Sequence, residues 1–124
     1  LRVKPKKVSL RLVLNRRMKN VRDLAVRKEW RRMGVEMTNA AYYILGQLSE
    51  QGGANQELSR LLEHTAPSLR NELSEPIRKV LAQCEALSFA PESMIGEMTE
   101  KAKLDKQIQE FEKVLGRAIE LAEI

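Results

Sequence analysis

Residues 104–122, LDKQIQEFEKVLGRAIELA, place apolar side chains at alternating steps of four and three residues. An α-helix turns once every 3.6 residues, so these steps gather the apolar side chains on one helical face and leave most charged ones on the other. Because further apolar residues extend this stripe upstream through Ala102, Met98 and Ile95 to Met94, we expect one long helix near residues 93–122. Its best-defined positions are Leu104, Ile108, Phe111, Leu115, Ala118 and Ala122.

A second stripe of this kind covers residues 23–50 and predicts another long helix there. Gly34 and Gly46 interrupt it, and each glycine inside a helix costs about 1 kcal/mol relative to alanine, so we expect either a kink or close packing. The adjacent Tyr42 and Tyr43 face two directions, which places one ring in the core and leaves the other half exposed. The stripe consists of Leu24, Val26, Trp30, Met33, Met37, Ala40, Ala41, Ile44, Leu45 and Leu48.

Polar residues and helix breakers predict the boundaries between these and several shorter helices. Asn20 to Asp23 are expected to end a short first helix, with Asp23 as the N-cap of the next one. Gly52-Gly53 are expected to end the long helix, and Asn55 to cap the helix that follows. Ser74-Glu75-Pro76 is expected to start a further helix, because a proline needs no amide partner in a first turn.

Composition supports a helical fold. The 124 residues are 43% hydrophobic and 31% charged but only 4% aromatic, which favours packed helices over a sheet. The predicted fold class is all-α, a single compact bundle of five to six helices, with long helices near residues 23–50 and 93–122. No apolar run approaches the roughly 20 residues of a membrane span, and a single cysteine allows no internal disulfide.

Charge is distributed unevenly along the chain. Residues 1–32 contain 13 Lys or Arg against two acidic residues, whereas residues 33–124 contain nine against 15. We therefore divide the chain into a basic, juxtamembrane-like lead with a short helix at 1–20 and a helical protein-interaction domain at 21–124. The lead suits a nucleic-acid arm, a surface for anionic lipid, the cytoplasmic flank of a preceding transmembrane helix, or simply a solvated helix face. The residues expected closest to a membrane are Arg16, Arg17, Lys19 and Arg22.

Cys84 and His64 are the only cysteine and the only histidine, so they form the one nucleophilic pair to weigh. Cys84 lies late in its predicted helix on an apolar stripe with Glu85 beside it, and both features disfavour the thiolate that such catalysis needs. We expect Cys84 to be a core residue and His64 to be structural. No catalytic residue and no cofactor site is predicted. A metal site is not predicted either, because one cysteine and one histidine leave too few ligands for a metal.

One segment also resembles a known family. The run LAQCEALSFAP, residues 81–91, resembles the "L-x-x-C-(D/E)-x-x-x-F/Y-A-P" segment in the cytoplasmic tail of BatD-type membrane proteins of the bacterial Bat (aerotolerance, or oxygen tolerance) family. The helical layout of residues 20–123 is similar as well. The matching positions are Cys84, Glu85, Phe89 and Pro91. By this resemblance Cys84 and Phe89 pack inward, while Pro91 resets the chain for the last helix.

The resemblance implies a function that the residues alone do not. Such proteins carry a single transmembrane helix followed by a helical tail, so a cropped start at Leu1 and a basic flank are expected for the tail. Their presumed partners are MoxR-type AAA+ ATPases and von Willebrand A-domain membrane proteins. We therefore expect a non-enzymatic interaction domain at the cytoplasmic face of the bacterial inner membrane. The alternative is a basic helical module that binds nucleic acid, whose affinity would fall steeply with salt.

Overall fold

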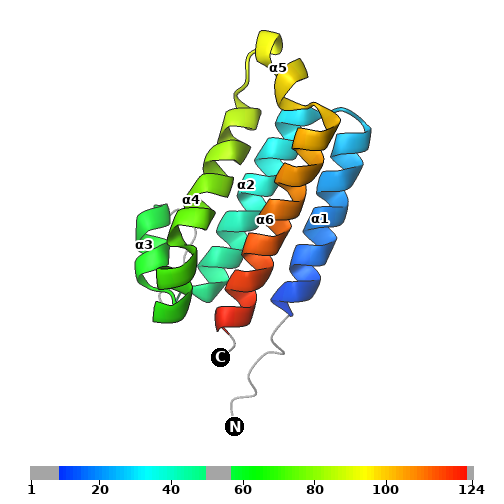
Figure 1. The fold of residues 1–124 in the computed structure, drawn as a ribbon. Helices are drawn as coiled ribbons and strands as arrows, with labels where there is room; N and C mark the ends of the chain where they lie inside the picture. The colour runs from blue at the N-terminus through cyan, green and yellow to red at the C-terminus, as the bar shows by residue number, and fades with distance from the viewer. Residues whose placement is uncertain (1–8, 50–56, 123–124) are drawn as a thin grey trace.

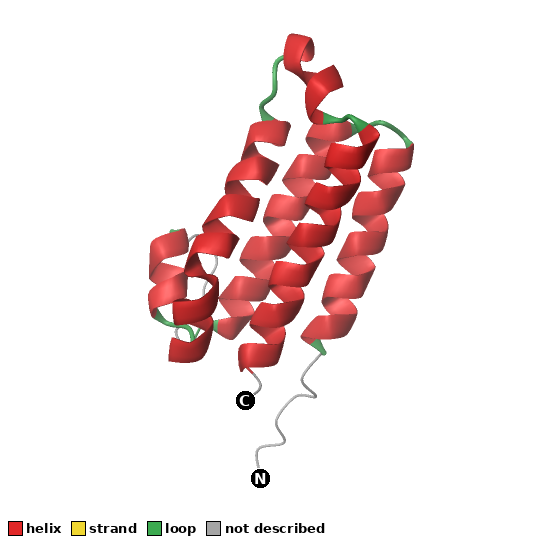
Figure 2. Cartoon of the chain, in the orientation of Figure 1, coloured by secondary structure: helices red, strands yellow, loops and turns green. Residues whose placement is uncertain are grey.

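The computed structural model describes residues 9–49 and 57–122, and the regular structure within those ranges is six helices and no strand (Figures 1 and 2). This confirms the all-α prediction. The expected stop at Gly52-Gly53 and the cap at Asn55 lie outside the described residues. The helices are α1 (Leu10–Val26), α2 (Trp30–Leu48), α3 (Leu58–Glu63), α4 (Pro67–Ser88), α5 (Glu92–Met98) and α6 (Lys101–Ala122).

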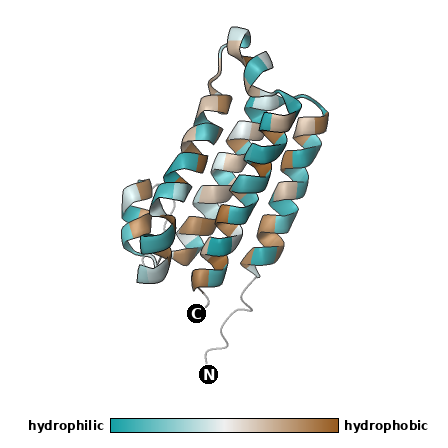
Figure 3. Cartoon of the chain, viewed as in Figure 1, coloured by the Kyte–Doolittle hydropathy of each residue, from teal (hydrophilic) through white to brown (hydrophobic). Residues whose placement is uncertain are grey.

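Four long helices, α1, α2, α4 and α6, form an antiparallel bundle in which each neighbour in the order α1–α2–α4–α6 packs on the next and α6 returns to α1 (Figure 1). Apolar and polar residues alternate around each long helix, so four apolar stripes can meet at the bundle centre (Figure 3). The short α3 lies beside the lower half of α4, and α5 stands beyond the opposite end. The largest fully buried side chains are Phe111, Leu14, Met18, Met33, Met37, Ile44, Leu45, Leu61, Leu69, Ile77, Leu81 and Leu87.

The first helix runs without interruption from Leu10 to Val26, so the break expected at Asn20 to Asp23 is wrong. Asn20 and Asp23 are exposed, and polar residues on the solvated face do not end a helix. The chain turns instead at Arg27 to Glu29, where Lys28 adopts φ 61°. The amides of Lys28 and Glu29 donate to the carbonyls of Ala25 (3.1 Å) and Leu24 (3.0 Å), the pair of bonds that defines a Schellman C-cap.

This turn changes how residues 1–50 are organised. The helix assigned to the lead crosses position 20, and its Leu14 and Met18 belong to the common core. The expected long helix over 23–50 becomes the end of α1, a turn and α2, and Val26, placed on the predicted stripe, is 81% exposed. The basic segment therefore helps to build the bundle.

The fourth helix continues through Pro76, so the helix start expected at Ser74-Glu75-Pro76 is wrong. Ser74 does not act as an N-cap, because its hydroxyl donates to the Arg70 carbonyl one turn back. An internal proline costs about 3 kcal/mol through its missing amide and the clash with the preceding turn. Burial of Leu73 and Ile77 on either side of it offsets that cost.

The last predicted helix is divided in two. The short α5 ends at Met98, and α6 begins at Lys101. None of the residues of α5 is buried, and Met94 is 51% exposed, so the apolar stripe begins at Leu104. From Leu104 the prediction is confirmed in detail, because five of its six stripe residues are buried and Ala122 packs against them.

Gly34 settles the choice between a kink and close packing at that position. It is buried where α2 packs on α4, and a methyl group there would lie 2.8 Å from the Cys84 carbonyl oxygen and 2.9 Å from the Ser88 amide nitrogen. Both are backbone atoms that cannot move aside cheaply. Glycine is needed because the two helix backbones approach closely.

Candidate functional site

Cys84 is fully buried in the core, as predicted. Burial, and secondarily the negative charge of Glu85, raises the pKa of the thiol to about 12. His64 follows α3 and precedes α4, whereas Cys84 lies 17 residues beyond the first residue of α4. At 1.5 Å per residue the helix separates Pro67 from Cys84 by about 25 Å. The two side chains therefore form no catalytic pair.

The four basic residues expected near a membrane lie on α1, but they do not share one environment. Arg22 makes a two-point ion pair with Glu112 of α6, at 2.9 and 3.4 Å. Arg17 places its guanidinium 5.3 Å from the ring centroid of Tyr43 on α2. Arg16 and Lys19 are exposed and pair with no carboxylate of the described residues.

The two tyrosines differ in exposure, as predicted. Tyr42 packs partly buried against the core, and Tyr43 is 42% exposed. Burial, and secondarily Glu85 on α4, raises the pKa of Tyr42 above its ordinary value.

Phe89 does not pack inward, and the expectation for this residue is wrong: its side chain is 84% exposed. The reason is helical phase. Five residues at 100° each carry the chain about 140° around the axis from the buried Cys84, so Phe89 emerges on the solvent side. Ala90, one residue later, is buried at 3% exposure and takes the inward position.

The turn that carries Phe89 is held firmly in place. Arg31 of α2 donates from Nε (3.2 Å) and Nη2 (3.0 Å) to the Ala90 carbonyl, and its Nη2 lies 3.3 Å from a carboxylate oxygen of Glu92. Pro91 occupies the N-cap of α5, so it resets the chain for that short helix rather than for the last long one. We call Phe89, Glu92, Met94, Glu97 and Glu100 the α4–α5 corner.

The α4–α5 corner combines exposed apolar and acidic side chains. Phe89 and Met94 are among the few large apolar residues that the described chain exposes by half or more. Residues 89–100 contain three glutamates and no lysine or arginine. Arg31 reaches Glu92, and Lys103 reaches Glu97 at 3.9 Å, while Glu100 makes no ion pair within the described residues. The corner is therefore an apolar projection surrounded by carboxylates.

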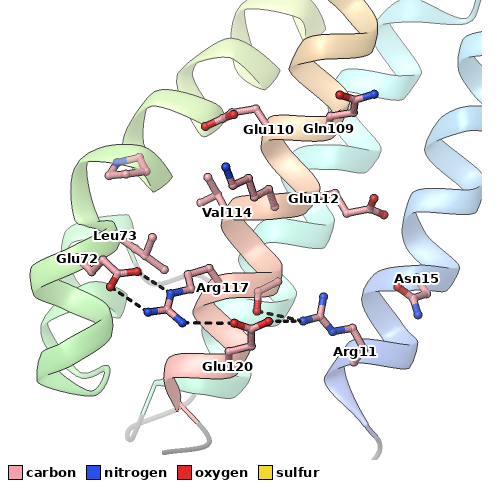
Figure 4. Close-up of a pocket in the computed structure, with 13 residues that line it drawn as sticks. Arg11, Asn15, Glu72, Leu73, Gln109, Glu110, Glu112, Val114, Arg117 and Glu120 are labelled. Carbon is pink, nitrogen blue, oxygen red and sulfur yellow. Dashed lines mark hydrogen bonds and ion pairs between the residues drawn. The ribbon is translucent and has the colours of Figure 1, made fainter.

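A second surface feature is an open groove of about 740 Å³ along the outward face of α6 (Figure 4). Leu73 and Pro76 of α4 and Val114 of α6 contribute its apolar lining. A chain of ion pairs crosses one end of it, Glu72–Arg117–Glu120–Arg11, with closest distances of 2.7, 3.4 and 3.2 Å.

This chain of charges links α4, α6 and α1. Hydrogen bonding to Arg117 lowers the pKa of Glu72 and correspondingly raises that of Arg117. Two arginines balance two glutamates, so the chain neutralises itself. The sequence offers no signal for it, because Arg11 and Glu120 are 109 positions apart and Arg117 and Glu72 are 45 apart.

No group of three or more His, Cys, Asp or Glu side chains lies close enough together to hold a metal ion in residues 9–49 and 57–122. Among the helices of those same ranges, none combines the length and the apolar character needed to cross a lipid bilayer.

Comparison with known proteins yields no relative. No family model, no curated protein and no solved structure matches this chain.

Proposed function

We propose that this chain is a non-enzymatic protein-interaction domain and that the α4–α5 corner is its docking surface. The observation that carries the proposal is Phe89, an aromatic side chain 84% exposed on a turn that Arg31 fixes from a different helix. Aromatic side chains seated in a partner's pocket contribute heavily to the binding energy of protein interfaces. A fixed turn also loses little conformational entropy on binding.

The composition of the corner defines the partner that it suits. Phe89 and Met94 require an apolar pocket, and the corner carboxylates favour a rim of lysine or arginine, Glu100 most of all because Glu92 and Glu97 already pair with Arg31 and Lys103. The same carboxylates disfavour contact with anionic lipid or nucleic acid at this end of the bundle. The partner is therefore a protein.

The resemblance of residues 81–91 to BatD-type tails supplies candidate partners. On that basis the domain belongs to a single-pass bacterial membrane protein of the Bat aerotolerance system and lies at the cytoplasmic face of the inner membrane. It docks a MoxR-type AAA+ ATPase or a von Willebrand A-domain membrane protein. The residues that carry the resemblance end in the docking turn itself, since Phe89 is the aromatic position of the shared segment.

The test is direct binding of the full chain to each purified candidate partner from the same organism, measured by calorimetry. Phe89→Ala should weaken binding by at least tenfold, as expected for an interface anchor. Leu12→Ala is the matched control, because Leu12 is also exposed (62%) but lies near the start of α1, at the end of the bundle opposite α5 (Figure 1). Binding that is equal for both variants, or absent for both partners, would refute the proposal.

A further inference from the structure

We propose that the half of the α1–α2 pair nearest the start of α1 is a binding surface for an anionic lipid bilayer. The surface consists of Leu12, Arg16, Arg17, Lys19 and Tyr43, which we call the basic face. The inference rests on the proposed function only for the presence of a membrane nearby. Its test does not involve the protein partner.

The basic face is rich in positive charge. Residues 9–22 and 37–49 contain five Lys or Arg and no Asp or Glu. Two of the five, Arg11 and Arg22, turn toward α6 and are neutralised there by Glu120 (3.2 Å) and Glu112 (2.9 Å). Arg16, Arg17 and Lys19 remain without a described carboxylate partner. The basic face therefore carries three positive charges that no carboxylate within residues 9–49 and 57–122 compensates.

The residues of the basic face also lie near one another. Leu12, Arg16 and Lys19 follow one another at steps of four and three on α1, so they share its outward side. Arg17 bridges to α2, where its guanidinium covers the ring of Tyr43 at 5.3 Å. The three cations of the basic face thus all lie on α1, and α2 contributes the aromatic ring of Tyr43 beside them.

Exposed apolar side chains on the basic face favour lipid over nucleic acid. Leu12 is 62% exposed and Tyr43 42% exposed among these cations. Apolar and aromatic side chains beside lysine and arginine suit the headgroup–acyl boundary of a bilayer. Single-stranded nucleic acid would need aromatic rings free for stacking, whereas the ring of Tyr43 is already covered by Arg17. The Leu12 side chain has neither a hydrogen-bond donor nor a charge with which to bind a phosphate backbone.

The arrangement also accommodates both proposed contacts at once. The basic face lies toward the end of the bundle where α1 begins and α6 finishes, and α5 lies beyond the other end (Figure 1). The α4–α5 corner and the basic face share no residue, so the bundle can contact a protein partner and a membrane at the same time. Arg22, expected near the membrane from sequence, is excluded from the surface by its bond to Glu112.

The experiment is co-sedimentation of the full chain with phosphatidylcholine vesicles that contain phosphatidylserine, compared with pure phosphatidylcholine. Removing a cation near an anionic bilayer should lower affinity about fivefold, so Arg16→Gln/Lys19→Gln should lower it about 25-fold. The matched control is Arg60→Gln/Lys79→Gln, which removes the same charge from exposed positions of α3 and α4. Each chain keeps the same basic residues at 2, 4, 6 and 7, so their contribution cancels.

A second pair of variants tests the apolar contribution. Leu12→Ser should weaken vesicle binding several-fold, whereas Met94→Ser, at the α4–α5 corner, should leave it unchanged. Equal losses for the two charge variants would overturn the proposal, because they would show an unspecific effect of net charge. Tighter binding to a DNA or RNA oligonucleotide than to the vesicles would overturn it in favour of nucleic acid. Failure of partner docking with intact vesicle binding would refute only the proposed function.

Discussion

At the scale of single residues, Cys84 shows how packing decides the chemistry of a side chain. A thiol acts as a nucleophile through its thiolate. Here burial and Glu85 raise its pKa to about 12, so at neutral pH the group is a small apolar side chain. Its neighbours on the same stripe, Val80, Leu81 and Leu87, are equally buried. Cys84 therefore stabilises the fold through the apolar surface that it buries.

The raised pKa of Cys84 predicts a pH effect on stability. The folded state holds the thiol proton more tightly than the unfolded state, whose pKa is near 9.0. The stabilising contribution is therefore complete below pH 9 and is lost progressively as pH rises toward 12. In urea denaturation, the free energy of unfolding should fall more steeply between pH 9 and 11 for the wild type than for Cys84→Ala.

The same pair of proteins gives the control for this prediction. At pH 7, Cys84→Ala should cost about 1 kcal/mol through lost packing. Alkylation of the folded wild type at pH 8 should be far slower than that of the denatured chain. Rapid alkylation of the folded protein would contradict the buried position of the sulfur.

At the scale of helices, the contact between α2 and α4 depends on Gly34, which has no side chain. The α2 backbone at Gly34 lies close against α4. A methyl group on Gly34 would be less than 3 Å from the Cys84 carbonyl oxygen and the Ser88 amide nitrogen. Ser88 adds a hydrogen bond from its hydroxyl to the same Cys84 carbonyl at 2.9 Å, so this stretch of α4 has little freedom to adjust.

Two glycine substitutions should consequently have opposite effects on the stability of the protein. Gly34→Ala should destabilise the protein by about 2 kcal/mol, because backbone atoms must separate to admit the methyl group. Gly96→Ala should stabilise it by up to about 1 kcal/mol, since Gly96 lies inside α5 with open space around it. Thermal unfolding measures both. A stabilising Gly34→Ala would mean that the helices lie further apart than the structure shows.

The helices also show which features a sequence can predict. The α6 stripe was predictable because period alone determines which face is buried, and the same reasoning located the buried positions of α2 and Cys84. The position of the first turn was not, because it depends on Lys28 adopting a left-handed conformation that glycine or asparagine usually occupies. Pro76 was misread because the tertiary packing around it outweighs its local preference.

The candidate binding surfaces, like the helices, could be predicted from the sequence only in part. The basic residues were evident in the sequence, but only the fold shows that Arg22 is neutralised by a residue 90 positions away and that Arg16 is not. The outward direction of Phe89 could have been found from its phase relative to Cys84. The resemblance suggested an inward residue, and helix geometry gives the correct answer.

At the scale of the whole molecule, the bundle separates its charges. Residues 9–49 contain nine Lys or Arg against three acidic residues, and residues 57–122 contain nine against 12. The two halves meet where α1 lies beside α6, and the pairs Arg11–Glu120 and Arg22–Glu112 cross that boundary. The first helix is therefore held to the last by charge as well as by its apolar stripe.

A charge-reversal cycle measures this contribution. Arg22→Glu should destabilise the protein by about 1 kcal/mol at low salt, because it removes a two-point pair and sets two carboxylates together. Combining it with Glu112→Arg should restore most of the loss. High salt should reduce the difference between single and double variants, since both side chains are partly exposed. A double variant as unstable as the single one would show that Arg22 acts through packing alone.

Helix α1 begins and helix α6 ends at the same end of the bundle (Figure 1). This arrangement determines how the molecule responds to force. Tension applied between the first and last helices would peel α1 from α6 one turn at a time, in unzipping rather than in shear. The Arg11–Glu120 bond would be loaded first, and Arg22–Glu112 would follow some three turns later. The α4–α5 corner, at the far end of the bundle, would be the last part of the molecule to feel the pull.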